Sequence, residues 1–249
     1  VKEVVPGFYR NVVSFDATSL YPSIIMQWNI SPETCVLKNA SLNADDFLRS
    51  NRKDIPEMVE DAQNKNACLA CNGSMFTNHI RGFIPTLIEI TFKQRQEAKK
   101  KMIELEKEYE VSKDTNLLPR IAALKIRQSV KKILANSLYG CLGNPAFTYS
   151  SPELATAVTV TGQVIIRTAE DEMNAYINKV MKSSQPKDYV IAVDTDSVYL
   201  NLDDIITKVS SNAKVDDITS FVNDICEKNI QPQLSKIMSG LSTKLNCKE

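Results

Sequence analysis

The chain has 249 residues, of which 43% are hydrophobic, and 30 Lys or Arg residues balance 30 Asp or Glu residues. This length can bury one substantial core or two smaller ones, and the balanced charge excludes an argument for nucleic-acid binding from the net charge alone. The six cysteines are irregularly spaced, and no signal peptide or bilayer-spanning apolar run is present. We therefore expect a globular, intracellular protein without a membrane partner.

The first predicted element is a short strand at residues 11–16, where apolar and β-branched side chains lead up to Asp16. A turn follows, and a helix is expected from about Ser23. Residues 37–77 have weak periodicity and many Asn, Asp and Lys residues, which is typical of a loop-rich excursion holding one short helix.

Within this excursion, Cys68 and Cys71 form a C-x-x-C pair. A structural zinc site needs about four ligands, and the chain has a single histidine, His79. Zinc is therefore disfavoured, and we interpret the two cysteines as small apolar side chains in a loop.

Two helical patterns follow, at residues 85–111 and 119–139, each opened by a proline, with apolar side chains three and four residues apart. The link at 112–118 is short enough to fold the second helix back antiparallel to the first. Residues 81–132 carry 13 Lys or Arg against 7 Asp or Glu. The sequence thus predicts a projecting helical hairpin with a surplus of positive charge.

The last third of the chain begins with a predicted long helix at 152–181. Two apolar strands, 189–193 and 197–202, are separated by the polar Asp194-Thr195-Asp196, which predicts a β-hairpin with carboxylates at its tip. Residues 203–246 are expected to form two or three helices.

Adjacent carboxylates at a sheet edge repel one another and resist desolvation, so a cation is expected beside Asp194 and Asp196. If the two strand ends lie side by side, Asp16 joins them. Oxygen ligands without His or Cys select Mg²⁺, or alternatively Mn²⁺, over zinc, and two such ions would suit phosphoryl transfer. The alternative for an isolated D-x-D is a solvated hairpin turn.

Polar side chains recur on one face of each hairpin helix: Arg95 and Lys99 lie four residues apart, and Lys132, Asn136 and Tyr139 share the face of the second helix. Facing inward, these groups would form a clamp for a triphosphate. The alternative is an ordinary solvated charge stripe, which does not explain the Asn and the Tyr.

Three stretches carry a resemblance to family B DNA polymerases. Residues 16–23 (DATSLYPS) resemble motif A, D-x-x-S-L-Y-P-S; residues 132–140 (KILANSLYG) resemble motif B, K-x-x-x-N-S-x-Y-G; and residues 194–197 (DTDS) resemble motif C. The wider sequence, including 29–34 and 140–144, resembles the polymerases of T-even-like tailed phages, and the similarity extends over nearly the whole chain.

The resemblance implies catalytic roles at the acidic cluster. Asp16 and Asp196 would bridge two Mg²⁺ ions, with Mn²⁺ as an alternative, while the Ala17 backbone carbonyl adds a ligand and Asp194 supports the site. It also implies dNTP-binding roles for Ser19, Leu20, Tyr21, Arg95, Lys99, Lys132 and Asn136. Among these, Ser19 and Leu20 would offer backbone N–H groups, and Tyr21 would exclude a 2′-hydroxyl. Tyr139 and Gly140 would border the nascent base pair.

The expected fold is α+β, with an antiparallel palm sheet flanked by helices and an inserted antiparallel helical hairpin, the fingers. Residues 1–84 would be the first part of the palm, 85–140 the fingers and 141–249 the second part of the palm. The family's exonuclease domain would precede this sequence and its thumb would follow. We therefore expect a fragment that is not active alone, since thumb contacts to the DNA backbone are missing.

The expected partners are primer-template DNA and dNTPs, with a sliding clamp for the full-length enzyme and the host cytoplasm as its location if the gene is viral. One departure from the family pattern is Ala192-Val193, where Tyr-Gly is usual. An alternative function is a non-catalytic module that binds dNTP and metal, or DNA, without turnover. An RNA-synthesising polymerase or a nuclease is disfavoured by Tyr21.

Overall fold

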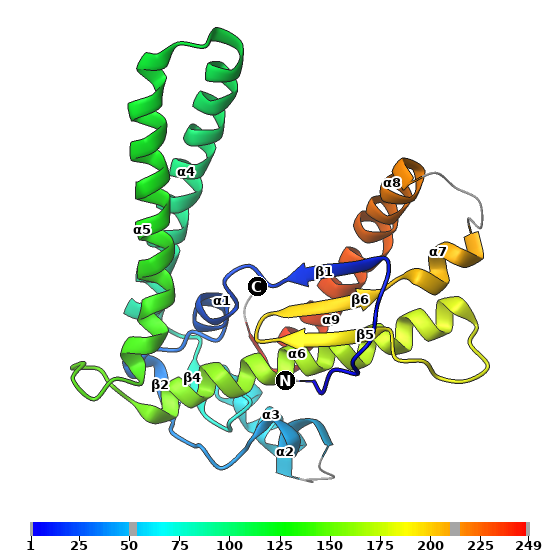
Figure 1. Ribbon diagram of the computed structural model, residues 1–249. Helices are drawn as coiled ribbons and strands as arrows, with labels where there is room; N and C mark the ends of the chain where they lie inside the picture. The colour runs from blue at the N-terminus through cyan, green and yellow to red at the C-terminus, as the bar shows by residue number, and fades with distance from the viewer. Residues whose placement is uncertain (1, 50–53, 210–214, 248–249) are drawn as a thin grey trace.

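The computed structural model describes residues 2–49, 54–209 and 215–247. Its central element is a three-stranded antiparallel sheet in the order β1-β6-β5, formed by β1 (Val12–Asp16), β6 (Ser197–Asn201) and β5 (Val190–Asp194). The long helix α6 (Pro152–Met181) runs beside this sheet and packs on β5 and β6 (Figure 1). Both the strand hairpin and the helix at 152–181 are therefore confirmed, and the α+β class holds for a chain in which helices predominate.

The sheet buries one face. Side chains in β1 alternate between exposed and half-buried, and Val13 and Phe15 point to the hydrophobic core, as the two-residue period of a half-covered strand requires. Helix α9 (Gln231–Lys244) packs on α6 and supplies side chains opposite β1 and β6. The other face of β1 stays free, so the carboxyl end of the strand is open to ligands.

The excursion at 37–77 differs from the prediction. It contains two helices, and its strands form a second three-stranded antiparallel sheet in the order β2-β4-β3. The elements are β2 (Cys35–Leu37), α2 (Ala44–Arg49), α3 (Asp54–Asn64), β3 (Ala67–Leu69) and β4 (Met75–Thr77). Cys68 lies in β3 rather than in a loop, and both it and Cys71 are fully buried. Burial raises the pKa of Cys71 to about 12, so these thiols are packing groups.

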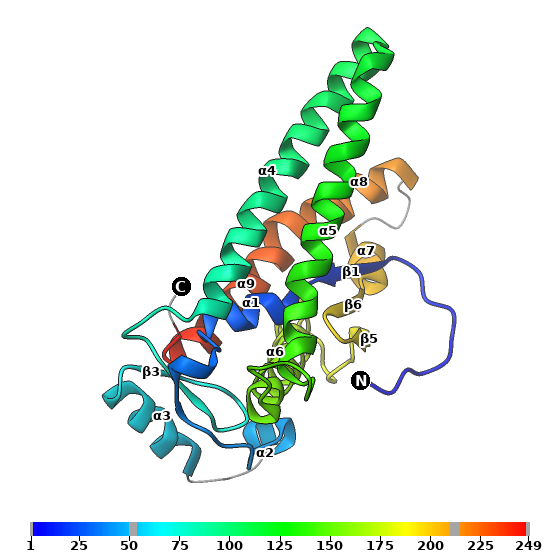
Figure 2. The same cartoon turned by 90° about the vertical axis from the view of Figure 1, so that its left-hand side faces the viewer.

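The predicted helical hairpin is present as α4 (Phe83–Ser112) and α5 (Leu118–Leu142), two antiparallel helices joined through a short 3-10 turn at Thr115–Leu117. Both helices begin one or two residues earlier and end slightly later than predicted. Figures 1 and 2 show the two helices projecting far beyond the rest of the molecule. We call α4 and α5 with their connecting turn the hairpin, and the rest of the described chain the body. Among the described residues, the base of the hairpin packs on the body, mainly against α1 (Leu20–Gln27) and α6.

Residues 203–246 form α7 (Asp203–Val209), α8 (Val215–Ile225) and α9, with a five-residue π-helical turn at Cys226–Ile230 joining the last two. The prediction of two or three helices is confirmed within the described residues, and 210–214 lie outside them. Helix α1 starts at Leu20, three residues before the predicted start. None of the described helices is long and apolar enough to cross a membrane.

Candidate active site

Strand register places three aspartates at the same end of the central sheet. Asp16 at the end of β1 stands opposite Ser197 at the start of β6, and Asp194 at the end of β5 stands opposite the same serine from the other side. Beyond the last strand pair, the Ala17 N–H donates to the Asp196 carbonyl at 2.8 Å. The two stretches that resemble motifs A and C are thus joined by backbone hydrogen bonds.

The tip of the β-hairpin is conformationally strained. Thr195 has φ 24°, and a β-branched residue with positive φ is a true outlier. The Thr195 hydroxyl donates to Asp194 Oδ1 at 3.1 Å, which holds the turn locally. Strain of this kind costs on the order of 1–3 kcal/mol and tends to occur at functional sites, so the conformation fits a turn shaped to present Asp196.

The carboxylates at this end of the sheet have no positive partner among the described residues. Asp16 Oδ2 accepts one hydrogen bond from the Ser197 hydroxyl at 3.2 Å, and no ion pair to Asp16, Asp194 or Asp196 occurs within the described parts of the chain. Oxygen donors of this type fit a hard divalent cation such as Mg²⁺. Across the same residues, however, no three Asp, Glu, His or Cys side chains converge as a metal-binding group. Substrate oxygens would have to complete any ion's shell.

The start of α1 lies beside these carboxylates. Ser19 is left-handed at φ 56° and ψ 55°, and its side chain does not cap the helix. The first backbone N–H groups of a helix have no intrahelical acceptors, so this end offers donors to an anion. Burial raises the pKa of Tyr21, and the neighbouring Tyr139 and Asp196 raise it further. The Tyr21 and Tyr139 rings are 4.7 Å apart, centroid to centroid.

A cavity of about 230 Å³ unites the three motif-like stretches. Its lining residues are Ser19, Leu20, Tyr21, Pro22, Asn136, Thr195 and Asp196. Asn136 comes from α5, so the base of the hairpin closes one side of the cavity. Gly140, one turn further along the same helix, has open space where a side chain would be.

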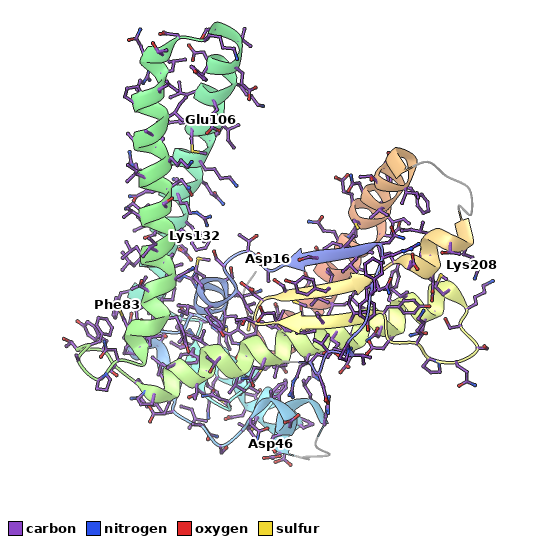
Figure 3. All side chains as sticks on the ribbon, viewed as in Figure 1. Asp16, Asp46, Phe83, Glu106, Lys132 and Lys208 are labelled. Atoms are coloured by element: carbon purple, nitrogen blue, oxygen red, sulfur yellow. The ribbon has the colours of Figure 1, made fainter. Side chains whose placement is uncertain are left out.

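The cationic residues of the hairpin are not brought to this cavity. Lys99 borders a shallow groove on α4 itself, and neither Arg95 nor Lys132 lines the cavity in the described structure. Figure 3 shows Lys132 on α5 above the level of Asp16. Arg95 is half-buried, and its buried Nε has no hydrogen-bond partner in the described part of the chain, so this donor is left for another ligand or another hairpin position.

Sequence reasoning gave no role to several residues that shape this site. Ser197 donates a hydrogen bond to Asp16. Ser197 directly follows Asp194-Thr195-Asp196 in the sequence, and this position could have identified it as part of the site. The positive φ of Thr195 could not be predicted from the sequence, because threonine rarely adopts this conformation. The Ala192-Val193 pair lies in β5 opposite Tyr199 and Val198, Val193 is buried, and Asp194 after it pairs with Ser197.

Comparisons with known proteins agree on one family. Residues 1–241 match the family described as DNA polymerase family B. The DNA-directed DNA polymerase of Enterobacteria phage T4 is 31% identical over all of this chain and 32% of its own length, and that of Escherichia phage RB69 is 30% identical over all of this chain and 31% of its own length. The chain therefore spans about a third of these relatives.

Structural comparison points the same way. The family B DNA polymerase from the archaeon Pyrobaculum calidifontis matches 85% of this chain and 23% of its own chain, with a TM-score of 0.51 and 22% sequence identity. At 22% sequence identity this match shows a similarity of fold alone.

Proposed function

The chain belongs to DNA polymerase family B, and on that premise we propose that it carries the nucleotidyl-transfer site of a template-directed DNA polymerase. The observation that supports this most directly is the register at the sheet edge. Asp16 pairs with Ser197 and Ala17 bonds to the backbone of Asp196, next to a cavity that also receives Asn136 from the hairpin. Primer-template DNA and dNTPs are the proposed substrates.

In the proposed reaction, the primer 3′-oxygen forms a bond to the α-phosphorus of a dNTP, and the bond from that phosphorus to the bridging oxygen breaks. Pyrophosphate leaves, and the 3′-hydroxyl proton passes to solvent water. Asp16 and Asp196, with the Ala17 carbonyl, would hold two Mg²⁺ or Mn²⁺ ions, and Asp194 would support them. When bound, such ions acidify the attacking hydroxyl and stabilise charge on the leaving group.

The start of α1 would bind the substrate. The backbone N–H groups at Ser19 and Leu20 suit the triphosphate, because helix N-termini bind anions. Tyr21 would place its ring beneath the sugar and exclude a 2′-hydroxyl. Asn136 would contact the triphosphate from the α5 side, while Tyr139 and Gly140 would border the new base pair.

Arg95, Lys99 and Lys132 would reach the triphosphate only if the hairpin moves toward the sheet edge. The unpartnered Nε of Arg95 and the exposure of both lysines support this proposal. Guanidinium and ammonium groups bind phosphate strongly when brought within hydrogen-bond distance. Such a movement would couple nucleotide binding to assembly of the site.

For the full-length enzyme, we expect a sliding clamp as a further partner and, if the gene is viral, the host cytoplasm as the site of action. The second candidate function is a module that binds dNTP and metal, or DNA, without turnover. It is favoured by the chain's coverage of only about a third of its phage relatives, since most duplex contacts would then lie outside it.

Primer extension by the natural gene product that carries these 249 residues tests the proposal. We expect dNTP incorporation with Mg²⁺, and a loss of about 10³-fold or more in kcat/KM for Asp16→Asn and for Asp196→Asn, because each removes charge that stabilises the transition state. Asp224→Asn is the matched control, since Asp224 pairs with Lys228 on α8 and the adjoining turn, outside the site.

Circular dichroism should show that all three variants fold alike. Retained activity in either site variant would contradict the metal-site assignment. Binding of dNTP without incorporation by the unmodified gene product would favour the binding module.

A further inference from the structure

Helix α6 contains one glycine, at position 162, in the middle of 30 helical residues. A glycine in a helix interior costs about 1 kcal/mol relative to alanine, so a specific contact is expected where one is present. Gly162 is buried, and α6 at this level packs against α1, as Figures 1 and 2 both show.

The contact that needs the glycine is the ring of Tyr21. A Cβ on Gly162 would stand 3.2 Å from Tyr21 Cε1, which is closer than an ordinary van der Waals contact. The other two neighbours, Ile24 Cδ1 at 3.5 Å and Leu20 Cδ2 at 3.6 Å, would be in normal contact. The tight approach is therefore to the tyrosine alone.

The Tyr21 ring is restrained on one side and has free space on another. Tyr139 packs against it with centroids 4.7 Å apart, and the 230 Å³ cavity lies open beside it. A methyl group at position 162 would shift the ring by a few tenths of an ångström away from α6. With Tyr139 restraining it, we expect the ring to move into the cavity.

We propose that Gly162 is a specificity-determining position, which sets how deeply the Tyr21 ring lies under the sugar of the incoming nucleotide. Gly162 itself touches no substrate and acts through Tyr21, so it is a positioning residue. This inference rests on the proposed function and deepens it, because it places the control of sugar selection on a helix outside the three motif-like stretches.

The test compares kcat/KM for a dNTP and its matching rNTP in the natural gene product. A ring pushed into the cavity crowds a 2′-hydroxyl more than a 2′-hydrogen, so Gly162→Ala should lower dNTP use modestly and rNTP use more. We expect the dNTP-to-rNTP preference to rise about tenfold, the lower end of what one added methylene changes in a pocket. Gly240→Ala in α9 is the matched control, since nothing lies within 4 Å of its Cβ position.

The double variant separates an effect on the ring from a general effect on folding. In a Tyr21→Ala background the methyl group meets no ring, so Gly162→Ala should leave the sugar preference unchanged, whereas in Tyr21→Phe the tenfold rise should persist. A rise of the same size in the Tyr21→Ala background would overturn the proposal, as would no change or a fall in the preference with Tyr21 present. If Gly162→Ala does not fold, removing the ring should restore folding, and failure to do so counts against the proposal.

The outcomes also distinguish this inference from the proposed function. If the unmodified protein incorporates no dNTP, the proposed function fails. If it incorporates dNTPs and Tyr21→Ala admits rNTPs, the function and the gate stand, and the Gly162 variants alone decide the inference.

Discussion

The carboxylate edge of the central sheet and the α4–α5 hairpin would supply the two halves of the proposed site, yet different contacts hold them. Asp16 and Asp196 are fixed by strand pairing and by the Ala17 to Asp196 hydrogen bond. In the part of the chain that the structure describes, the hairpin packs on the body through its base, and Ile133 on α5 is 65% exposed. The acidic half is therefore held by backbone hydrogen bonds between strands, and the cationic half is held to the body by helix packing at its base.

The contrast in packing predicts the largest difference in stability. Trp28 in the body is 1% exposed, and its indole N–H donates to the Leu69 carbonyl at 3.0 Å, so Trp28→Ala should lower the free energy of unfolding by about 3–5 kcal/mol. Ile133→Ala on the hairpin should change it by less than about 0.5 kcal/mol. Urea unfolding of both variants measures the difference, and similar losses would contradict the distinction between body and hairpin.

A smaller effect is expected within the hairpin. Lys132→Ala should raise the dNTP KM about 10- to 100-fold, because a hydrogen bond from a charged donor is removed from the triphosphate. Lys125→Ala is the matched control: it lies two turns further from the body on the same face of α5 and should change KM little. Equal effects from both lysines would indicate a general attraction of DNA to the hairpin, and no effect from Lys132 would remove it from the site.

The smallest effect concerns the carboxylate edge itself. Thr195→Gly should raise the free energy of unfolding by about 1 kcal/mol, since glycine adopts positive φ without strain and this relief exceeds its added chain entropy. The same change at Thr243, in the last turn of α9, should instead lower stability by about 0.5 kcal/mol. Thermal unfolding of the two variants measures whether each change raises or lowers the free energy of unfolding. A loss at Thr195 would show that the turn is not strained.

The sequence predicts the fold best where apolar residues recur at a regular spacing along a long element. Helix α6 was expected at 152–181 and has those bounds, because apolar spacing continues over many turns. The second sheet was missed because β3 and β4 have three residues each, all buried. Strands that short and buried on both faces show no alternation, and their pairing joins residues distant from one another in sequence.

In the candidate site, too, some positions can be predicted from the sequence and others cannot. The ends of the apolar strands predict that Asp16 lies near Asp194 and Asp196, and the register places Asp16 and Asp194 on either side of Ser197. The hairpin residues were assigned to a shared face by helix periodicity, which sets direction but not distance. For that reason Asn136, near the base, reaches the cavity, while Lys132, one turn further out, does not. The contact between Gly162 and Tyr21 joins two helices far apart in sequence and has no local signal.

The π-helical turn at Cys226–Ile230 has a consequence for how this chain tolerates changes in length. A π turn accommodates one residue more than the α-helix around it, and each residue rotates the helix by about 100°. Loss of one residue there would restore regular α-helical winding and leave the faces of α8 and α9 nearly unchanged, because the wider π turn absorbs the extra residue. Related genes that are one codon shorter or longer in this stretch should therefore encode the same arrangement of Asp16, Asp194 and Asp196 at the end of the central sheet.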